Sequence, residues 1–214
     1  MSADRPHPDS VRCPWCLAGT TEPDPLYIRY HDCEWGTPLH ADNVLFELLV
    51  LEGAQAGLNW RLVLHKRQGY REAFCGPGAA VLDPRTVARL GETDQERLRA
   101  DARIIRNRQK IAAAIGNARA FLEIVDAFGS FDTYLWRFVD GAPVQNAWAI
   151  LSQIPVRTAL SDALAKDLLA RGMKFVGTTI MYAYMQSTGL VNDHLTGCFR
   201  HRELAAATSF PVKG

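Results

Sequence analysis

A run of apolar residues at helical spacing constrains this chain more than any other feature of its sequence. The run comprises Ile104, Ile111, Ile115, Ala118, Leu122 and Val125. This spacing places the side chains on one face of an α-helix, which must then be buried against other elements. We therefore predict a long helix from about Arg106 to Phe128, with Gly129 just past its end.

Helix start and stop signals recur along the rest of the chain. We predict further helices from Asp42, over 59–66, from Asp83-Pro84, from the capping box Thr93–Glu96, from Ser161 to just before Gly172, and over 178–188. Residues 13–43 are aromatic and show no helical period, so we expect an irregular segment that wraps over a core. Because almost nothing alternates with a period of two, the sequence predicts an all-α fold.

Length and composition place the chain among ordinary globular proteins. It has 214 residues, of which 48% are hydrophobic and 22% are charged. This size suits one domain, or two small ones that share a core, and requires no disulfide framework. The composition excludes collagen-like, mucin-like and globally disordered classes. No apolar run approaches the roughly 18 residues that a membrane span requires.

The five cysteines indicate a reduced protein. Their number is odd, and the N-terminus lacks the apolar core of a secretory signal. We therefore expect a cytoplasmic protein whose thiols are free or bound to a metal. Residues 1–12 are polar and aperiodic, which indicates a frayed N-terminus.

Charge is nearly balanced over the chain but not along it. The net charge of +1 implies no bulk attraction to nucleic acid. A local stretch nevertheless carries six basic residues, which are Arg97, Arg99, Arg103, Arg106, Arg108 and Lys110. It lies between two predicted helices, where backbone N–H groups and cations together favour phosphate binding. The alternative is a solvated cationic face.

Four potential metal ligands lie near the two ends of the sequence. Cys13 and His31 are near the start, and His194 and Cys198 are near the end. The spacing of the second pair places both side chains on one side of a helical turn. Two thiolates and two imidazoles form a closed tetrahedral zinc shell, which leaves no position for a catalytic water. Free buried thiols and surface histidines are the alternative. The Cys13-x-x-Cys16 motif also permits a zinc knuckle or a redox pair.

One carboxylate lies on a face that should be buried. Glu52 follows Leu48 by four residues and therefore continues the apolar stripe of the helix that begins at Asp42. A buried carboxylate is costly unless it is satisfied. Together with Trp60 and the aromatic segment, it suits a pocket for a flat, cationic or electron-poor ring. The alternatives are that the helix ends at Leu51 and that the tryptophans only pack in the core.

Several long motifs resemble those of one enzyme family. They are Asp24–Ile28, Tyr30–Asp32, Glu34–Gly36, Leu51–Trp60, Ile104–Arg108, Gly116–Ala120, Lys174–Ile180 and Gly189–His194. In this order they resemble the 3-methyladenine DNA glycosylase I family over roughly residues 13–198. That family cleaves the N-glycosidic bond of 3-methyladenine in alkylated DNA.

The resemblance implies a fold and a metal. The fold is an all-α helix-hairpin-helix DNA glycosylase domain over 13–198, with the helix-hairpin-helix at about 93–128. A structural Zn²⁺ joins the N- and C-terminal segments. Its implied ligands are Cys13, His31, His194 and Cys198. The tail over 199–214 shows no resemblance, and we expect it to be disordered.

The resemblance also assigns a base pocket. Glu52 and Tyr30 are implied to hydrogen-bond the base, Trp60 and Trp15 to stack on it, and Trp35 to lie nearby. Glu52 is the catalytic candidate, since the usual catalytic aspartate of related enzymes is absent. Methylation at N3 makes adenine a cationic leaving group, so the enzyme only has to extrude the nucleotide and hold the base.

The implied partner is double-stranded DNA with alkylated bases, bound by a monomer that releases free 3-methyladenine. Leu58 is a candidate wedge for the gap left by the extruded base, although it equally suits a core position. Arg103, Arg106 and Lys110 are candidate DNA contacts. Arg103 and Gln109 replace glycines of the family hairpin. These glycines let the backbone approach a phosphate closely.

Two further inferences follow from the residues themselves. His31 adjoins Tyr30 and Cys13 lies close to Trp15, so we expect the zinc to hold these aromatic residues in place. Cys16 is a rival ligand to Cys13. Two other functions remain open: a DNA-binding module that senses alkylation without turnover, and a zinc-dependent hydrolase of small molecules, which requires an open coordination position.

Overall fold

The chain folds into two compact units, each built from segments far apart in the sequence. The structure, a computed structural model, describes residues 10–18 and 22–208. Unit 1 comprises the described parts of Met1–Pro38, Val139–Val156 and Met185–Gly214. Unit 2 comprises Leu39–Phe138 and Arg157–Tyr184.

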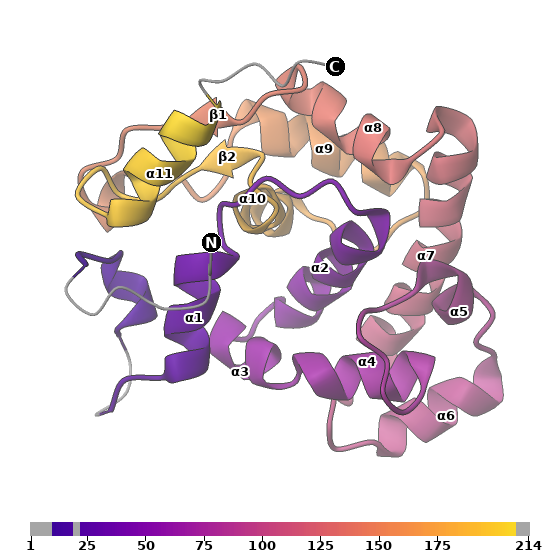
Figure 1. The fold of residues 1–214 in the computed structure, drawn as a ribbon. Helices are drawn as coiled ribbons and strands as arrows, with labels where there is room; N and C mark the ends of the chain where they lie inside the picture. The colour runs from indigo at the N-terminus through magenta and orange to yellow at the C-terminus, as the bar shows by residue number, and fades with distance from the viewer. Residues whose placement is uncertain (1–9, 19–21, 209–214) are drawn as a thin grey trace. The chain divides into compact units, whose positions relative to one another are not determined.

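Unit 2 is an assembly of helices around α7 (Arg108–Phe128), which contacts α2, α5, α6 and α8 (Figure 1). The other helices of the unit are α2 (Asp42–Gln55), α3 (Trp60–His65), α4 (Arg67–Cys75), α5 (Pro84–Ala88), α6 (Glu92–Ala100), α8 (Phe131–Trp136), α9 (Ala159–Ala170) and most of α10 (Thr178–Ser187). Its core is aromatic: the Phe121 ring stacks on Phe131 at 4.1 Å and meets Phe46 edge-on at 5.2 Å.

The long helix predicted from the apolar run is confirmed as α7. Its predicted face is buried at Ile111, Ile115 and Ala118. The side chain of Asn107 caps its start by accepting the N–H groups of the next turn, so the helix begins slightly later than expected. Gly129 ends it with a φ of +85°, a conformation that favours glycine.

The other helices of unit 2 begin at or near the positions that the sequence predicts, but not always with the predicted capping residue. Asp83 caps α5 as predicted. Asp42 was expected to cap α2, but it lies in the first turn, and its carboxylate accepts the N–H groups at the start of α8. The α9 cap is Thr158 rather than Ser161, which is its partner in the capping box. Asp94 accepts the N–H of Gly91, so α6 begins at Glu92.

Unit 1 combines helices with one short parallel strand pair. Its helices are α1 (Pro25–Cys33) and α11 (Phe199–Thr208), with the last turn of α10. Strands β1 (Val144–Gln145) and β2 (Val191–Asn192) pair in parallel, with Val144 opposite Val191. The fold is therefore mostly helical, as predicted, apart from a strand pair that the sequence did not indicate.

Two predictions for unit 1 are wrong. Residues 13–43 contain α1, because Asp24 accepts two N–H groups of the first turn and Pro25 occupies the first helical position. The tail over 199–214 is not disordered from its start. Helix α11 occupies residues up to Thr208, since Leu204 is buried and His201 Nε2 donates to the Asn146 carbonyl at 2.7 Å. Residues 1–9 and 209–214 lie outside the described part.

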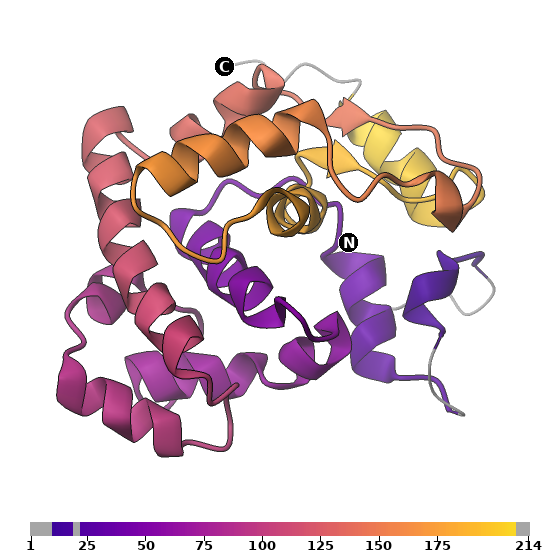
Figure 2. The same cartoon turned by 180° about the vertical axis from the view of Figure 1, so that it is seen from behind.

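Seen from behind, helix α9 leads through the connection 171–177 into α10 (Figure 2). The connection contains Gly172, which has a φ of +85°, and Gly177, which directly precedes α10. Within the described ranges, no helix has both the length and the apolar character needed to cross a membrane.

Candidate functional site

Four buried side chains from distant parts of unit 1 converge on one point. They are Cys13, His31, His194 and Cys198. Their candidate ligand atoms all lie within 4.8 Å of one another. The structure thus brings together the residues that the sequence placed near its two ends. It corrects one detail, because His194 and Cys198 lie in a turn between β2 and α11 rather than on a helix.

The outer nitrogens of both histidines donate to acceptors. His31 Nδ1 lies 2.8 Å from a carboxylate oxygen of Asp32, which Arg12 holds with three hydrogen bonds. His194 Nε2 lies 3.0 Å from the carbonyl oxygen of Trp35. Since a carboxylate and a carbonyl only accept, these ring nitrogens carry the hydrogens. The other nitrogens therefore turn lone pairs toward the thiols, the arrangement of metal-binding histidines.

The distances between the donor atoms fit a tetrahedral zinc ion. His194 Nδ1 lies 3.6 Å from each of the two sulfur atoms, and Cys198 Sγ lies 3.5 Å from His31 Nε2. With metal–sulfur and metal–nitrogen bonds of about 2.3 and 2.0 Å, a tetrahedral shell separates sulfur from nitrogen by about 3.6 Å. The cluster can therefore hold a metal in a closed shell.

The electrostatics of the cluster favour the forms that bind metals. The hydrogen bond from Cys13 lowers the pKa of Cys198, and the same bond raises the pKa of Cys13. Burial lowers the pKa of His194, so its imidazole is neutral at neutral pH. A thiolate such as that of Cys198 and a neutral imidazole such as that of His194 are ligands that zinc takes.

Cys16, the rival ligand, points away from the cluster. Its thiol donates to the carbonyl oxygen of Cys13 at 3.2 Å. Burial raises the pKa of Cys16 to about 12, and the hydrogen bond with Cys198 together with burial raises the pKa of Cys13 as well, so geometry and not pKa separates the two thiols. Within the described ranges, the metal-binding group contains Cys13 and not Cys16. The structure therefore favours the ligand set with Cys13.

Three of the candidate base-binding residues adjoin the candidate metal ligands in unit 1. The Trp15 ring meets His31 edge-on at 5.3 Å and Trp35 edge-on at 5.0 Å. The Trp35 ring in turn lies 4.6 Å from the ring of His194. Tyr30 is buried on α1, next to His31 in the chain. The expected proximity of the cluster to the aromatic residues is present.

Glu52 lies on α2 in unit 2 and is 3% exposed. The helix continues to Gln55, so the alternative in which it ends at Leu51 is wrong. Glu52 contributes to the wall of a cavity of about 160 Å³. The residues that line this cavity are Glu52, Gln55, Ala56, Gly57, Leu58, Thr179, Ile180 and Ala183. A carboxylate is thus available to a guest in this cavity.

Two more candidates follow Glu52 in the turn from α2 to α3. Leu58 is 42% exposed, so the alternative of a core position is wrong. Trp60 begins α3 and is largely buried. Asn59 caps α3 with its side chain and so fixes where this helix starts.

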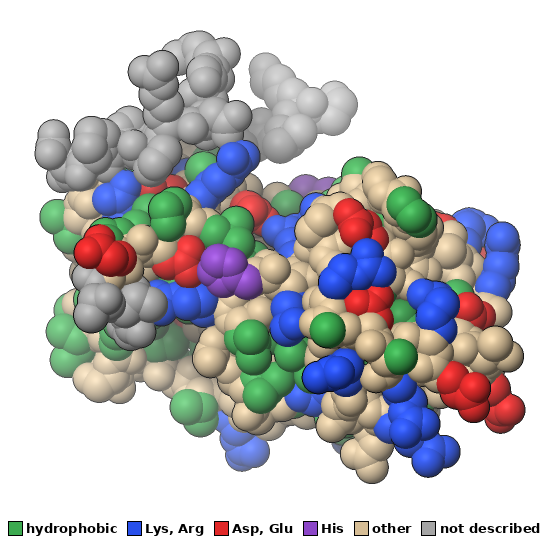
Figure 3. Space-filling view, turned by 90° about the horizontal axis from the view of Figure 1, so that it is seen from below, with side chains coloured by type: hydrophobic (Ala, Val, Ile, Leu, Met, Phe, Trp, Pro, Cys, Tyr) green, Lys and Arg blue, Asp and Glu red, His purple; other side chains and the backbone are tan. Residues whose placement is uncertain are grey.

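The basic stretch is partly neutralised by ion pairs. Arg103 pairs with Asp101 at 2.7 Å and with Glu72 at 2.9 Å. Arg106 and Arg108 are exposed and make no ion pair with any described residue. Figure 3 shows Lys and Arg side chains interspersed with Asp and Glu over the side of unit 2 that carries α4 and α6. The stretch thus presents a mixed surface with a few available cations.

Lys110 is used inside unit 2. Its Nζ atom donates to the carbonyl oxygens of Ala54 and Ala56, at 2.8 and 2.6 Å. Burial lowers the pKa of Lys110. Its ammonium group therefore binds the C-terminal end of α2, a contact that sequence spacing does not reveal.

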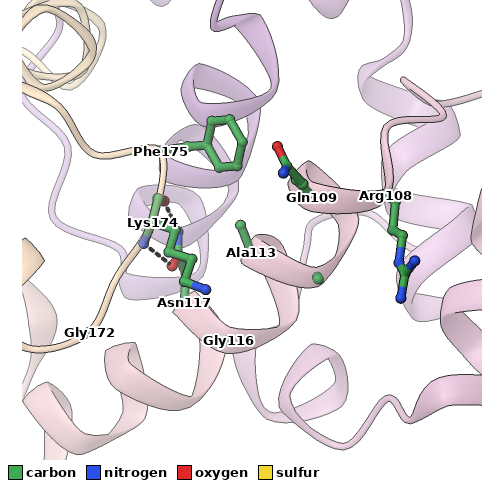
Figure 4. Close-up of a pocket in the computed structure, with 9 residues that line it drawn as sticks. Arg108, Gln109, Ala113, Gly116, Asn117, Gly172, Lys174 and Phe175 are labelled. Carbon is green, nitrogen blue, oxygen red and sulfur yellow. Dashed lines mark hydrogen bonds between the residues drawn. The ribbon is translucent and has the colours of Figure 1, made fainter.

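A second group of residues in unit 2 lines a larger cavity, and the sequence had placed only some of them, such as Arg108 of the basic stretch. A cavity of about 570 Å³ lies beside the first turns of α7 (Figure 4). The cations Arg108 and Lys174 line it, together with Gln109 and Phe175. Asn117 fixes the loop by exchanging two hydrogen bonds with the backbone of Lys174, at 2.8 and 2.9 Å. Two of the lining residues, Lys174 and Phe175, belong to the motif over 174–180 that resembles the family.

Comparison with known proteins gives concordant results. The family model for methyladenine glycosylase matches residues 19–201. DNA-3-methyladenine glycosylase 1 of Escherichia coli (strain K12) is 50% identical over 187 residues, which are 87% of this chain and 95% of that protein.

Solved structures agree with these matches. A crystal structure of 3-methyladenine DNA glycosylase I has a TM-score of 0.81 at 51% identity, and the match covers 88% of this chain and 98% of that one. A variant of such an enzyme in complex with 3-methyladenine has a TM-score of 0.80 at 34% identity, over 87% and 96% of the two chains. The chain therefore belongs to the methyladenine glycosylase family.

Proposed function

We propose that this protein is a DNA-3-methyladenine glycosylase of base-excision repair. It hydrolyses the N-glycosidic bond of 3-methyladenine in alkylated double-stranded DNA, releases the free base and leaves an abasic site. The observation that carries the proposal is the 50% identity to the Escherichia coli enzyme over 95% of its length. The match to a relative with 3-methyladenine bound supports the choice of base.

The chemistry requires little acid catalysis. A methyl group on N3 gives adenine a positive charge, and breaking the bond to C1′ returns the bonding electrons to the base as neutral 3-methyladenine. The sugar develops oxocarbenium character, and a water molecule adds to C1′ and loses a proton. The protein's contribution is to extrude the nucleotide and hold the base while this bond breaks.

We assign base recognition to five side chains. As the resemblance to the family implies, they are Glu52, Trp60, Tyr30, Trp15 and Trp35. Burial of Glu52 in a cavity wall supports the assignment, because an anion in a water-poor site attracts a cationic ring strongly. Trp60 and Trp15 supply faces for stacking. Glu52 binds the base edge and is the candidate catalytic residue.

DNA binding uses exposed groups of unit 2. Leu58 fills the gap left by the extruded nucleotide, which its 42% exposure in a turn supports. Arg106 contacts phosphate from the connection between α6 and α7, which is the hairpin of the helix-hairpin-helix that we propose over about 93–128. Arg103 serves as a weaker contact because it is paired with Asp101. The loop with Lys174 offers a further cation.

We propose Zn²⁺ for the cluster in unit 1, with Cys13, His31, His194 and Cys198 as ligands. The donor set and the tetrahedral spacing support zinc over a hard cation, which prefers oxygen ligands. When bound, the ion cross-links the N- and C-terminal segments of unit 1. Since four protein ligands leave no open position, the reaction steps belong to the side chains alone.

The proposal is tested by identifying the bases released from methylated duplex DNA. We expect wild-type protein to release 3-methyladenine, and Glu52→Ala to release it at least 100-fold more slowly while remaining folded. Glu52→Gln is the matched variant: it keeps the shape of the side chain and removes its charge, and therefore tests the charge by itself. Absence of free 3-methyladenine with intact DNA binding would instead indicate a module that senses alkylation without turnover.

A further inference from the structure

Near the end of α2, the backbone carbonyl of Ala54 accepts a hydrogen bond from a side chain that is distant in the sequence. The last carbonyls of a helix lack partners within the helix. The Gly53 carbonyl accepts the N–H of Ala56, and the Gln55 carbonyl accepts the N–H of Leu58 at 2.6 Å. The carbonyl of Ala54, between them, accepts from Lys110 Nζ at 2.8 Å.

Lys110 also binds a backbone carbonyl just beyond the end of α2. Its Nζ atom also donates to the Ala56 carbonyl at 2.6 Å. Ala56 is where the chain leaves the helix, with a φ of −43° and a ψ of 117°, and Gly57 follows with a φ of +73°. One ammonium group thus holds both sides of the point where the backbone turns toward Leu58 and α3.

The lysine itself is held rigidly. It lies in the first turn of α7, and its N–H donates to the capping side chain of Asn107 at 3.1 Å. A cation at the C-terminus of α2 is also favoured by the helix dipole. The turn after α2 is therefore anchored to α7, the longest helix of unit 2, and its position does not depend on the short loop alone.

This turn carries the groups that the proposed function uses. Glu52 lies two residues before Ala54, Leu58 lies two residues after Ala56, and α3 begins at Trp60. Ala56 also lines the cavity of about 160 Å³ to which Glu52 and Leu58 contribute.

We propose that Lys110 is a positioning residue for base recognition and base extrusion, and not a phosphate contact. By binding the carbonyls of Ala54 and Ala56, it sets the place of Glu52 on one side of the turn and of Leu58 on the other. The inference rests on the proposed function. Small displacements of such groups slow a reaction strongly, by up to roughly 100-fold for about 1 Å.

The test compares Lys110→Met with a matched control, Lys66→Met. Lys66 makes the same kind of bond, from its Nζ to the Ala102 carbonyl at 2.7 Å, but outside the turn. We expect Lys110→Met to lower the single-turnover rate of 3-methyladenine release by about 10- to 100-fold. It should weaken binding of free 3-methyladenine as well. Lys66→Met should leave binding of the free base unchanged.

Salt dependence separates positioning from phosphate binding. A lost phosphate contact lowers the affinity for undamaged duplex and flattens the slope of log K against log salt by about 0.9. We expect Lys110→Met to change neither. A flattened slope with a wild-type single-turnover rate would overturn the proposal, and so would a wild-type rate with wild-type binding of the free base.

Amide hydrogen exchange supplies a readout that does not depend on activity. The N–H of Leu58 should exchange faster in Lys110→Met than in Lys66→Met, whether or not the wild type releases a base. Unchanged exchange would overturn the positioning role, whereas failure of the wild type to release 3-methyladenine would overturn only the proposed function. If Lys110→Met does not fold, Lys110→Leu carries the test, and a wild-type release rate in that variant contradicts the proposal.

Discussion

The Nε2 atom of His194 donates to the carbonyl oxygen of Trp35 at 3.0 Å, so a metal-binding candidate is bonded to the backbone of a base-binding candidate. The Trp35 ring also lies 4.6 Å from the His194 ring, and Trp15 packs against both Trp35 and His31. These contacts within unit 1 give a physical form to the idea that the metal holds aromatic side chains in place.

Removal of the metal should therefore weaken base binding before it unfolds the helices. We expect a chelator to lower the affinity for free 3-methyladenine at least tenfold while the far-ultraviolet circular dichroism of the helical units persists. The reason is that the ligands belong to unit 1, whereas most helices belong to unit 2. Titration calorimetry and circular dichroism on the same samples measure both effects. Equal loss of both signals would contradict this view.

The ligand set predicts which cysteine controls metal content. Cys13→Ser should abolish stoichiometric zinc, because it removes one donor from the closed shell. Cys16→Ser is the matched control, three residues away and equally buried, and should retain one zinc per chain. Elemental analysis of the purified variants decides the matter. Zinc lost from Cys16→Ser and kept in Cys13→Ser would reverse the assignment.

The sequence named the four residues of the Cys/His cluster, but their spacing left free thiols and surface histidines open, and the resemblance to the family was needed to favour a metal site. The sequence was not sufficient to place Lys110, which looks like part of a basic stretch until the fold brings it to the end of α2. Arg103 is similar, since its partner Glu72 lies on another helix. Which charges pair over long range depends on the tertiary structure, so the pairs cannot be predicted from the charges that are neighbours in the sequence.

The lowered pKa of Glu47 should make the stability of the fold depend on pH. Burial raises its pKa, but hydrogen bonds and charges of Arg71 and Arg67 outweigh burial, so the pKa of Glu47 lies below its ordinary value of 4.5. A lowered pKa stabilises the fold above the unfolded-state value, and this contribution is lost as pH falls through the folded-state value. Thermal melts from pH 7 to pH 3 should therefore show a steeper loss in the wild type than in Glu47→Gln.

The loss of stability at pH 7 tests the same network, with an exposed ion pair as the control. Glu47→Gln should destabilise unit 2 by about 3 kcal/mol at pH 7, because it leaves two guanidinium groups without their buried partner. Glu203→Gln breaks an exposed pair with Arg200 and should cost less than about 1 kcal/mol. Similar losses in the two variants would show that the Glu47 network contributes little.

A glycine in α4 sets how closely the connection between α6 and α7 can pack. A Cβ atom on Gly69 would lie 2.6 Å from the carbonyl oxygen of Arg103. Gly69→Ala should therefore displace the connection and destabilise the protein by about 1–3 kcal/mol. Gly116→Ala on α7 meets nothing within 4 Å and should stabilise by about 0.5–1 kcal/mol. Chemical denaturation measures both, and a neutral Gly69→Ala would contradict the close packing.

The same Asp-Pro signal marks the start of two helices in different settings. Asp83-Pro84 begins α5 as predicted, whereas Asp24-Pro25 begins α1 inside an aromatic segment whose sequence shows no helical period. The aromatic residues of α1 pack against residues distant in sequence, so its sequence lacks a simple apolar stripe. Helix α11 was missed for a related reason, since side-chain bonds to other segments anchor it.

The most direct test of the whole account is a crystal structure of the protein with free 3-methyladenine. The account predicts the base in contact with the Glu52 carboxylate, stacked on Trp60 and within hydrogen-bond distance of Tyr30. A base bound elsewhere, with these three side chains untouched, would contradict it.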